Sequence, residues 1–376
     1  MTDMGEPPAG LSRIAPSGVR RGGRMKAAVL QGADQDLVIE DFESPDVGDD
    51  DVLMEVTACG VCHTDLKVQD GSIPTSLPAV LGHEVSGVVV GAGKNQREHF
   101  KDGENVTVGM RFRCGRCEYC MTGLSNLCQQ MPLGSPYRKS DGETVTRWNV
   151  GGFTQLLSVP AYMVFHLPDG VGLEESCIVG CRVTTAYNAV KNGAHLAPGE
   201  SAMVIGCGGV GLNIIQMLRL FGAYPIVAVD VVGSKLEAAL SYGASHIVNA
   251  TADDPVEATK EITKGGARKT FEAIGNPVTA DQIVRATRPT GTATIVGAMP
   301  PGPITINDSR FPFKEIKVTG VAMRRTSDVT EVLDLVSQGR IELGSFITKR
   351  YGFEQINEAI EDVHHGNVLM GITLWN

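Results

Sequence analysis

The glycine pattern Gly206-Cys-Gly208-Gly-Val-Gly211 constrains the fold of this chain more than any other feature of its sequence. A short apolar run precedes it, and an amphipathic stretch follows it. At such a strand-to-helix junction, the first glycine permits a tight turn and the second lets a pyrophosphate approach the backbone. The third allows the helix to pack closely on the strand. Because the N-terminus of a helix favours an anion, the pattern predicts a dinucleotide-binding unit.

The sequence around this turn alternates between short apolar runs and amphipathic stretches, which predicts a doubly wound parallel sheet. Strands are expected at 202–206, 226–230, 246–248, 269–273 and 292–296, with helices such as 212–221 and 234–242 between them. Beyond residue 319 the pattern predicts a helix at 328–338, a strand at 347–351, a helix at 353–364 and a strand at 371–375.

Asp230 ends the second expected strand, nineteen residues after Gly211. A carboxylate at this position accepts hydrogen bonds from the adenosine ribose hydroxyls and repels a 2′-phosphate, so we expect NAD rather than NADP. The alternative interpretation is a glycine turn in a sheet protein that binds no nucleotide.

The N-terminal part of the chain has a different pattern. Residues 25–110 alternate β-rich runs with turn residues, which predicts a compact, mostly antiparallel β domain, whereas residues 111–150 lack periodicity. Residues 1–24 contain Pro, Gly and four Arg but no apolar stretch, so we expect a flexible tail rather than a secretory signal.

Composition excludes several classes of protein. The chain has 376 residues, which suits two domains, and its net charge of −10 disfavours nucleic acid as a partner. The sequence contains no run of about 18 apolar residues, so we expect no membrane-spanning helix. Four of the nine cysteines are clustered, which is more typical of metal binding in a reducing cytoplasm than of a disulfide framework.

The cysteine cluster reads Cys114-x2-Cys117-x2-Cys120-x7-Cys128. Four thiolates at this spacing can surround a zinc ion tetrahedrally and leave no position open for a substrate. The spacing therefore predicts a structural zinc site that stabilises a lobe with little apolar core of its own. Two disulfides are the alternative.

A second set of candidate ligands is dispersed along the chain. Cys62 lies in GVCHTD, His83 in GHEVSG and Cys181 in GCR. One imidazole and two thiolates would leave a fourth position for a water or an alcohol, as at a catalytic zinc. Spacing alone does not group these residues, because an isolated Cys or His is more often a buried core residue.

The motifs taken together resemble the zinc-containing alcohol dehydrogenases of the medium-chain dehydrogenase/reductase superfamily. The resemblance covers nearly all of residues 25–376. It rests on five motifs in one order, namely GVCHTD, GHEVSG, the four-cysteine lobe, IVGCRVTTAYNAV and VIGCGGVG. It implies a GroES-like β catalytic domain at 25–185 that contains the zinc lobe at 111–130. A Rossmann NAD-binding domain would follow at 186–322, and residues 323–376 would return to the catalytic domain.

The resemblance also implies a role for individual residues. Cys62, His83 and Cys181 would hold the catalytic zinc, with Glu84 behind it, Asp65 orienting a ligand imidazole and Thr64 passing on the alcohol proton. His63 would face the cofactor pyrophosphate, Thr185 the nicotinamide and Lys235 the adenosine ribose. The expected cofactor site also includes Gly206, Gly208, Gly209, Val210, Gly211, Asp230 and Val296. Cys59, Cys177 and Cys207 receive no role.

The function that this resemblance implies is reversible hydride transfer from an alcohol, bound as an alkoxide on zinc, to NAD, which gives an aldehyde or ketone. Specialised relatives are the nearest alternative: dehydrogenases for a thiol adduct of formaldehyde, for a polyol, or for an aromatic or terpenoid alcohol. A zinc-free NADPH-dependent reductase and a non-catalytic binding protein are further alternatives. By resemblance we expect a homodimer or homotetramer that pairs through a sheet edge near residues 292–306.

Two positions depart from the family's pattern. Met370 stands where an Arg often contacts the cofactor phosphate, and Lys67 stands where a His often relays the alcohol proton. A lysine side chain is a poor proton acceptor at neutral pH because its usual pKa is about 10.4. Either the site makes this amine a better acceptor, or the proton leaves through water, and we hypothesise the second route.

Under this hypothesis, Lys67→His should raise the turnover rate at low pH, because an imidazole would add a proton acceptor that the lysine does not supply. Rates measured from acid to neutral pH test this expectation. A pH profile identical to that of the unmodified enzyme would contradict it.

Overall fold

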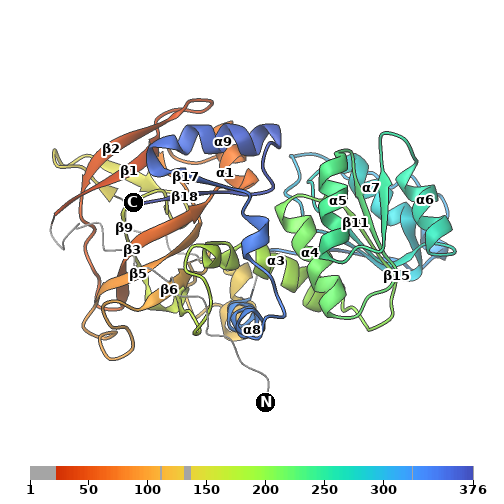
Figure 1. Cartoon of the computed structure of the whole chain (residues 1–376), viewed down its shortest axis with the longest axis horizontal. Helices are drawn as coiled ribbons and strands as arrows, with labels where there is room; N and C mark the ends of the chain where they lie inside the picture. The colour runs from red at the N-terminus through yellow and green to blue at the C-terminus, as the bar shows by residue number, and fades with distance from the viewer. Residues whose placement is uncertain (1–22, 111, 131–136, 324, 376) are drawn as a thin grey trace, which may run out of the picture.

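The computed structural model describes residues 23–110, 112–130, 137–323 and 325–375. Almost all of the tail expected at 1–24 lies outside these residues. The molecule has two halves (Figure 1). One contains two β-sheets built mainly from the N-terminal part of the chain, and the other a parallel sheet covered by helices.

The parallel sheet has the strand order β13-β12-β11-β14-β15-β16, and every neighbouring pair is parallel. Its strands are β11 (Ala202–Ile205), β12 (Ile226–Asp230), β13 (His246–Asn249), β14 (Ala267–Glu272), β15 (Thr287–Ile295) and β16 (Lys317–Gly320). Four helices connect them: α4 (Gly209–Leu220), α5 (Gly233–Tyr242), α6 (Pro255–Ile262) and α7 (Pro277–Ala286). This order, which runs outward in both directions from β11, confirms the expected Rossmann sheet.

The edge of this sheet differs from the expectation. The edge was expected near residues 292–306, but β15, which ends at Ile295, pairs with β14 on one side and with β16 on the other. The prediction was wrong because β16 has the sequence KVTG, which lacks the apolar run by which the other strands were recognised. Its side chains are mostly exposed, so β16 is the edge strand beside β15.

The other half contains two sheets, in the orders β2-β1-β4-β8-β7 and β10-β6-β5-β3-β18-β17, with β9 also paired to β3. The strands of the first are β1 (Arg24–Leu30), β2 (Leu37–Glu43), β4 (Ala79–Val80), β7 (Tyr137–Arg138) and β8 (Thr144–Arg147). Those of the second include β3 (Asp51–Gly60), β5 (Glu84–Ala92), β6 (Asn105–Val108), β9 (Leu156–Pro160) and β10 (Val164–His166). Most of these pairs are antiparallel, as expected for a GroES-like domain.

The last part of the chain returns from the parallel sheet to this half. It forms α8 (Thr326–Ser337), β17 (Lys349–Gly352), α9 (Ile356–His365) and β18 (Gly371–Leu374). β18 runs antiparallel to β3, with Ile372 opposite Gly60, and the Val61 N–H donates to the Gly371 carbonyl at 3.0 Å. The expected return of the chain therefore has a structural counterpart, whereas the exact domain boundaries stay predictions.

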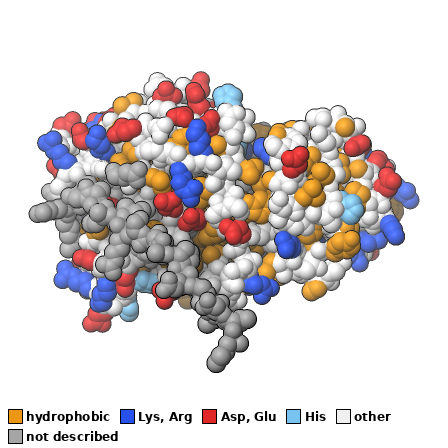
Figure 2. Space-filling model, in the orientation of Figure 1, with side chains coloured by type: hydrophobic (Ala, Val, Ile, Leu, Met, Phe, Trp, Pro, Cys, Tyr) orange, Lys and Arg blue, Asp and Glu red, His pale blue; other side chains and the backbone are white. Residues whose placement is uncertain are grey.

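A shared hydrophobic core joins the two halves. One cluster of buried residues combines Ala58 and Ile372 from β3 and β18 with Val204 and Leu212 from β11 and α4. On the face seen in Figure 2, hydrophobic side chains gather along the junction of the halves, while charged side chains of both signs are scattered over the surface. In the described part of the chain, no helix is long and apolar enough to cross a membrane.

Candidate active site

Three distant segments bring a group of ligand-type side chains together. Cys62 immediately precedes α1 (His63–Gln69), His83 precedes β5, and Cys181 precedes α3 (Arg182–Asn188). One potential ligand atom from each of these residues and one from Glu84 all lie within 4.8 Å of one another, in a buried cluster. The structure thus places the three expected ligands side by side, and their role as ligands stays a prediction.

Asp65 fixes the geometry of this cluster. Its carboxylate, which is 1% exposed, accepts hydrogen bonds from the Cys62 N–H, the Gly82 N–H and the Nδ1 of His83, each at 3.1 Å. The Nε2 of His83 is buried and has no hydrogen-bond partner among the described residues. Because a buried polar atom without a partner is costly, this nitrogen suits a metal ion as its partner. Burial alone would lower the pKa of His83, but Asp65 outweighs it and raises that pKa well above its usual range.

The pKa values of the two thiols in the cluster are shifted in opposite directions. A hydrogen bond from the Cys181 thiol lowers the pKa of Cys62 well below its usual range, and the same contact raises the pKa of Cys181. Cys62 therefore favours the thiolate, the form in which cysteine binds metals. Thr64 lies beside this sulfur, with its Oγ1 at 3.6 Å from the Sγ of Cys62.

An ion pair closes the buried side of the cluster. The Nε and Nη2 of Arg182 donate to the two carboxylate oxygens of Glu84 at 2.8 and 2.5 Å, and Nη2 also donates to the Val61 carbonyl. Burial raises the pKa of Glu84, which the positive charge of Arg182 partly opposes. Burial also favours the neutral form of Arg182, but Glu84 outweighs it and raises the pKa of Arg182. Sequence reasoning placed Glu84 here and gave no role to Arg182, although this residue lies in the GCR motif beside Cys181.

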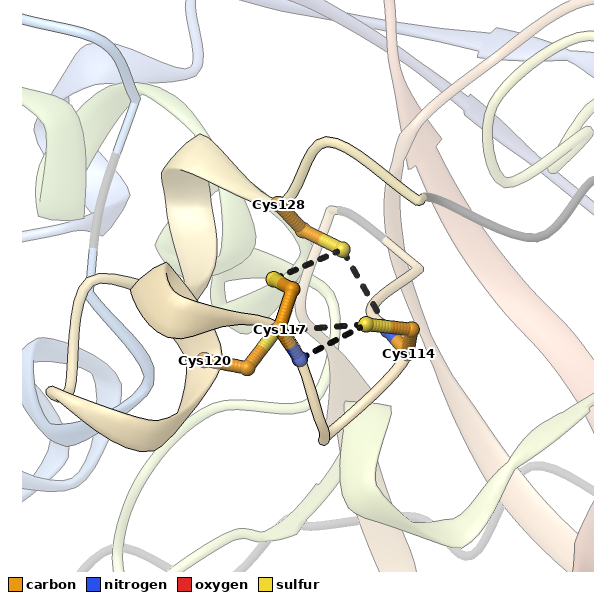
Figure 3. Close-up of side chains that lie close together, drawn as sticks. All are labelled: Cys114, Cys117, Cys120 and Cys128. Carbon is orange, nitrogen blue, oxygen red and sulfur yellow. Dashed lines mark hydrogen bonds between the residues drawn. The ribbon is translucent and has the colours of Figure 1, made fainter.

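The second group of thiols lies in the lobe that follows β6. Cys114, Cys117, Cys120 and Cys128 point toward one another (Figure 3). The sulfurs of Cys114 and Cys120 are 4.0 Å apart, and those of Cys117 and Cys128 are 3.9 Å apart. All four are free thiols.

Backbone N–H groups point at these sulfurs. The Cys117 N–H donates to Cys114 Sγ and the Cys114 N–H donates to Cys128 Sγ, both at 3.3 Å. A backbone hydrogen bond from Arg116 lowers the pKa of Cys114 to about 6, whereas burial raises the pKa of Cys120 to about 11. Four sulfurs at such spacing, with donors that stabilise thiolates, fit a tetrahedral zinc ion.

A cavity of about 1040 Å³ extends from the first cluster to the glycine turn of the parallel sheet. Many predicted site residues line it, namely Cys62, His63, Thr64, Cys181, Thr185, Gly206, Gly208, Gly209, Val210, Asp230, Lys235 and Val296. The other predicted residues, His83, Glu84, Asp65 and Gly211, lie outside its lining. One cavity therefore contains both the metal-type ligands and the nucleotide-type turn.

The glycine turn has the geometry that its sequence predicts. Gly206 adopts a positive φ of 95° between β11 and α4. A Cβ built on Gly211 would lie 1.7 Å from the Gly206 carbonyl oxygen, so only glycine permits this close approach. Asp230 lies at the end of β12, where its carboxylate accepts the backbone N–H groups of Cys207, Val231 and Val232 at 2.7 to 2.9 Å. These bonds hold the carboxylate at the mouth of the turn.

Two further residues bridge or line the cavity. The ammonium group of Lys67 donates to the Ala298 carbonyl at 2.6 Å and thereby links α1 to the loop after β15. Trp148 lines the cavity and meets the His83 ring edge-on at 5.7 Å. Trp148 lies in the segment 111–150, whose sequence lacks periodicity.

Comparisons with known proteins agree with this geometry. A family model described as the alcohol dehydrogenase GroES-like domain matches residues 48–169, and one described as zinc-binding dehydrogenase matches residues 209–338. An NDMA-dependent alcohol dehydrogenase from Amycolatopsis methanolica is 30% identical over 93% of this chain and 99% of its own length. This chain belongs to the zinc-containing alcohol dehydrogenases. It is therefore an oxidoreductase that acts on a small molecule.

Other relatives of this dehydrogenase differ in the substrate that their names specify. An S-(hydroxymethyl)glutathione dehydrogenase from Paracoccus denitrificans is 31% identical over 94% of this chain and all of its own length. The crystal structure of benzyl alcohol dehydrogenase from Acinetobacter calcoaceticus has a TM-score of 0.87 at 30% identity and covers 94% of this chain and 99% of that one. Membership in the family thus leaves the substrate open.

The hydrogen bonds of Asp65 generate a prediction about metal affinity. We expect Asp65→Asn to weaken zinc binding at the buried cluster by roughly 10- to 100-fold, because the carboxylate no longer orients the His83 imidazole. Zinc retention against a graded series of chelator concentrations measures the effect.

The four-cysteine lobe supplies the matched control. Cys120→Ser should release the zinc of the lobe and spare that of the buried cluster, so the two variants should lose different zinc ions. Identical zinc retention in Asp65→Asn and in the unmodified enzyme would contradict the proposed role of Asp65.

Proposed function

We propose that this dehydrogenase oxidises an apolar primary or secondary alcohol with NAD and uses one catalytic and one structural zinc ion per chain. The observation that carries the proposal is the single cavity in which a buried Cys-His-Cys cluster and a glycine turn with Asp230 meet. A hydride can be transferred directly only if donor and acceptor are held together, and such a shared cavity supports that arrangement.

The residues of the cluster fit a catalytic zinc. Cys62, His83 and Cys181 would hold the ion, because they offer two sulfurs and one buried imidazole nitrogen without another partner. When bound, zinc supplies Lewis acidity toward the alcohol oxygen, and NAD supplies the hydride acceptor. Cys114, Cys117, Cys120 and Cys128 would hold the structural ion.

Other residues of the chain would orient the reactants and accept the proton. Thr64 lines the cavity beside the Cys62 sulfur, and its hydroxyl would accept the alcohol proton. Desolvation lowers the pKa of His63, which lines the cavity. Thr185 and Val296 would bound the nicotinamide, and Lys235 the adenosine ribose.

The cavity wall supports an apolar substrate. Its lining includes the apolar residues Val61, Ile73, Met110, Leu124, Leu127 and Trp148. Such side chains gain free energy from burying a hydrocarbon chain or ring, which favours an apolar alcohol. A thiol adduct of formaldehyde is the second candidate, since the relative from Paracoccus denitrificans is named for such a substrate.

We also propose that the enzyme is a cytoplasmic homo-oligomer. The edge strand β16 has mostly exposed side chains, among them Val318. An unpaired edge can add a strand from a second copy of the same chain, which supports a homodimer or homotetramer.

The first experiment measures NADH formation by the purified enzyme over a panel of alcohols that includes aliphatic, aromatic, polyol and thiol-adduct substrates. Turnover of an apolar alcohol that a zinc chelator abolishes is the expected result, because the chelator removes the Lewis acid. Zinc analysis should give two ions per chain. Turnover that persists after complete loss of zinc would contradict the proposal.

Asp230 generates a separate prediction about the cofactor. Asp230→Asn should lower the ratio of kcat/KM with NAD to kcat/KM with NADP by about tenfold or more, because the neutral amide no longer repels a 2′-phosphate. The single amide oxygen can keep either the bond from Cys207 or those from Val231 and Val232, so the ratio of the two cofactors is compared rather than the affinity for either one. Steady-state kinetics with both cofactors test this, and an unchanged ratio would show that Asp230 does not select the cofactor.

A further inference from the structure

The guanidinium of Arg182 has one nitrogen that the ion pair with Glu84 does not use. Arg182 is 5% exposed, and its Nε and Nη2 are occupied by the Glu84 carboxylate and the Val61 carbonyl. Its Nη1 has no hydrogen-bond partner within the described part of the chain. Because Nη1 is not among the fully buried unpartnered atoms of the described residues, it reaches the open cavity that Arg182 lines, where a ligand can accept a hydrogen bond from it.

This free nitrogen lies against the glycine turn. A Cβ built on Gly209, the first residue of α4, would be 2.7 Å from the Nη1 of Arg182. Arg182 and Gly209 both line the cavity. The unpartnered donor and the N-terminus of a 12-residue helix therefore face the same space.

We propose that the Nη1 of Arg182 donates a hydrogen bond to the cofactor pyrophosphate at the N-terminus of α4, and that Glu84 holds the guanidinium in place for this contact. The proposal rests on the proposed function, because it requires a dinucleotide in the cavity. A fixed guanidinium adds a full positive charge to the partial charge of the helix end. Two of its nitrogens are already oriented by Glu84, so little rotamer entropy is lost on binding.

The position of Met370 agrees with this assignment. The resemblance places an arginine for the cofactor phosphate in the last strand, but Met370 occupies that position and is buried. Its Cε would be 3.3 Å from a Cβ on Gly60, and the same Cβ would be 2.4 Å from a carboxylate oxygen of Glu84. An apolar side chain thus borders Glu84 on this side, and the cation comes from α3 instead.

Equilibrium binding to the full-length protein tests the proposal without catalysis. ADP-ribose carries the pyrophosphate and adenosine carries no phosphate, so the ratio of their affinities isolates the pyrophosphate contact. We expect Arg182→Lys to lower this ratio by roughly tenfold or more, because the single amine cannot both pair with Glu84 and reach Gly209. Titration calorimetry for ADP-ribose and displacement of NADH fluorescence for adenosine give the two constants.

A second variant and a control test whether the change in the ratio comes only from leaving Glu84 unpaired or from replacing any buried arginine. The pair Arg182→Met with Glu84→Gln removes both buried charges together and should lower the ratio as Arg182→Lys does. Arg147→Lys changes another buried arginine, which bonds the Val150 and Ser158 carbonyls outside the cavity lining, and should leave the ratio unchanged. Zinc content and melting temperature are measured for every variant.

The binding results distinguish a failure of the Arg182 contact from a failure of the proposed function. If Arg182→Lys weakens the affinity for ADP-ribose and not that for adenosine, the result supports the contact. An equal loss of affinity for both ligands, or no loss of affinity, overturns it. If the unmodified protein binds neither ADP-ribose nor NADH, the proposed function fails instead. Arg182 then has no cofactor to contact, and the proposal falls with it.

Discussion

The buried carboxylate of Asp65 is the constraint on which the candidate active site depends. It accepts N–H groups from the residue before α1, from the turn before β5 and from the imidazole of His83. Without these bonds, Cys62 and His83 would be side chains of two separate loops, each free to turn away from the other. A charge-assisted acceptor with three donors holds both loops and leaves one imidazole nitrogen directed at the sulfurs.

The junction of the two halves places this cluster beside the nucleotide-type turn. Because β18 pairs with β3 and the shared core continues into β11 and α4, the parallel sheet is anchored to the other half by packed side chains rather than by a linker alone. The bond from Lys67 to Ala298 adds a polar contact across the cavity. The distance between the two sites is therefore set by a packed interior, which has little freedom to change.

Local patterns predicted the features that depend on neighbouring residues. The glycine turn, the strands around it and the four-cysteine lobe each lie within a few tens of residues, so spacing alone indicated their geometry. In the Cys-His-Cys cluster, Cys181 lies 98 residues after His83, and only resemblance to a family grouped these residues before the structure did. Arg182 and β16 were missed for the same physical reason. Their importance comes from what packs against them, and a single sequence does not record that.

The charges around the cluster also indicate which ion suits it. Glu84 is neutralised by Arg182, so the carboxylate adds no net charge to the buried group. Two ionised sulfurs of Cys62 and Cys181 would repel each other strongly in so small a buried space, and a dication between them removes that repulsion. Two thiolates and an imidazole prefer zinc over a hard cation such as magnesium.

A buried ion pair seldom stabilises a fold more than apolar side chains of similar volume would, because removing two charges from water is costly. The ion pair of Glu84 and Arg182 also contacts two sites of the cavity region. One partner borders the sulfur cluster, and the other presents a free nitrogen to the glycine turn. Replacing the pair by apolar residues would preserve the packing and remove the only guanidinium that the described residues place against the first residue of α4. The buried pair is therefore better explained by the two sites it connects than by the stability it adds.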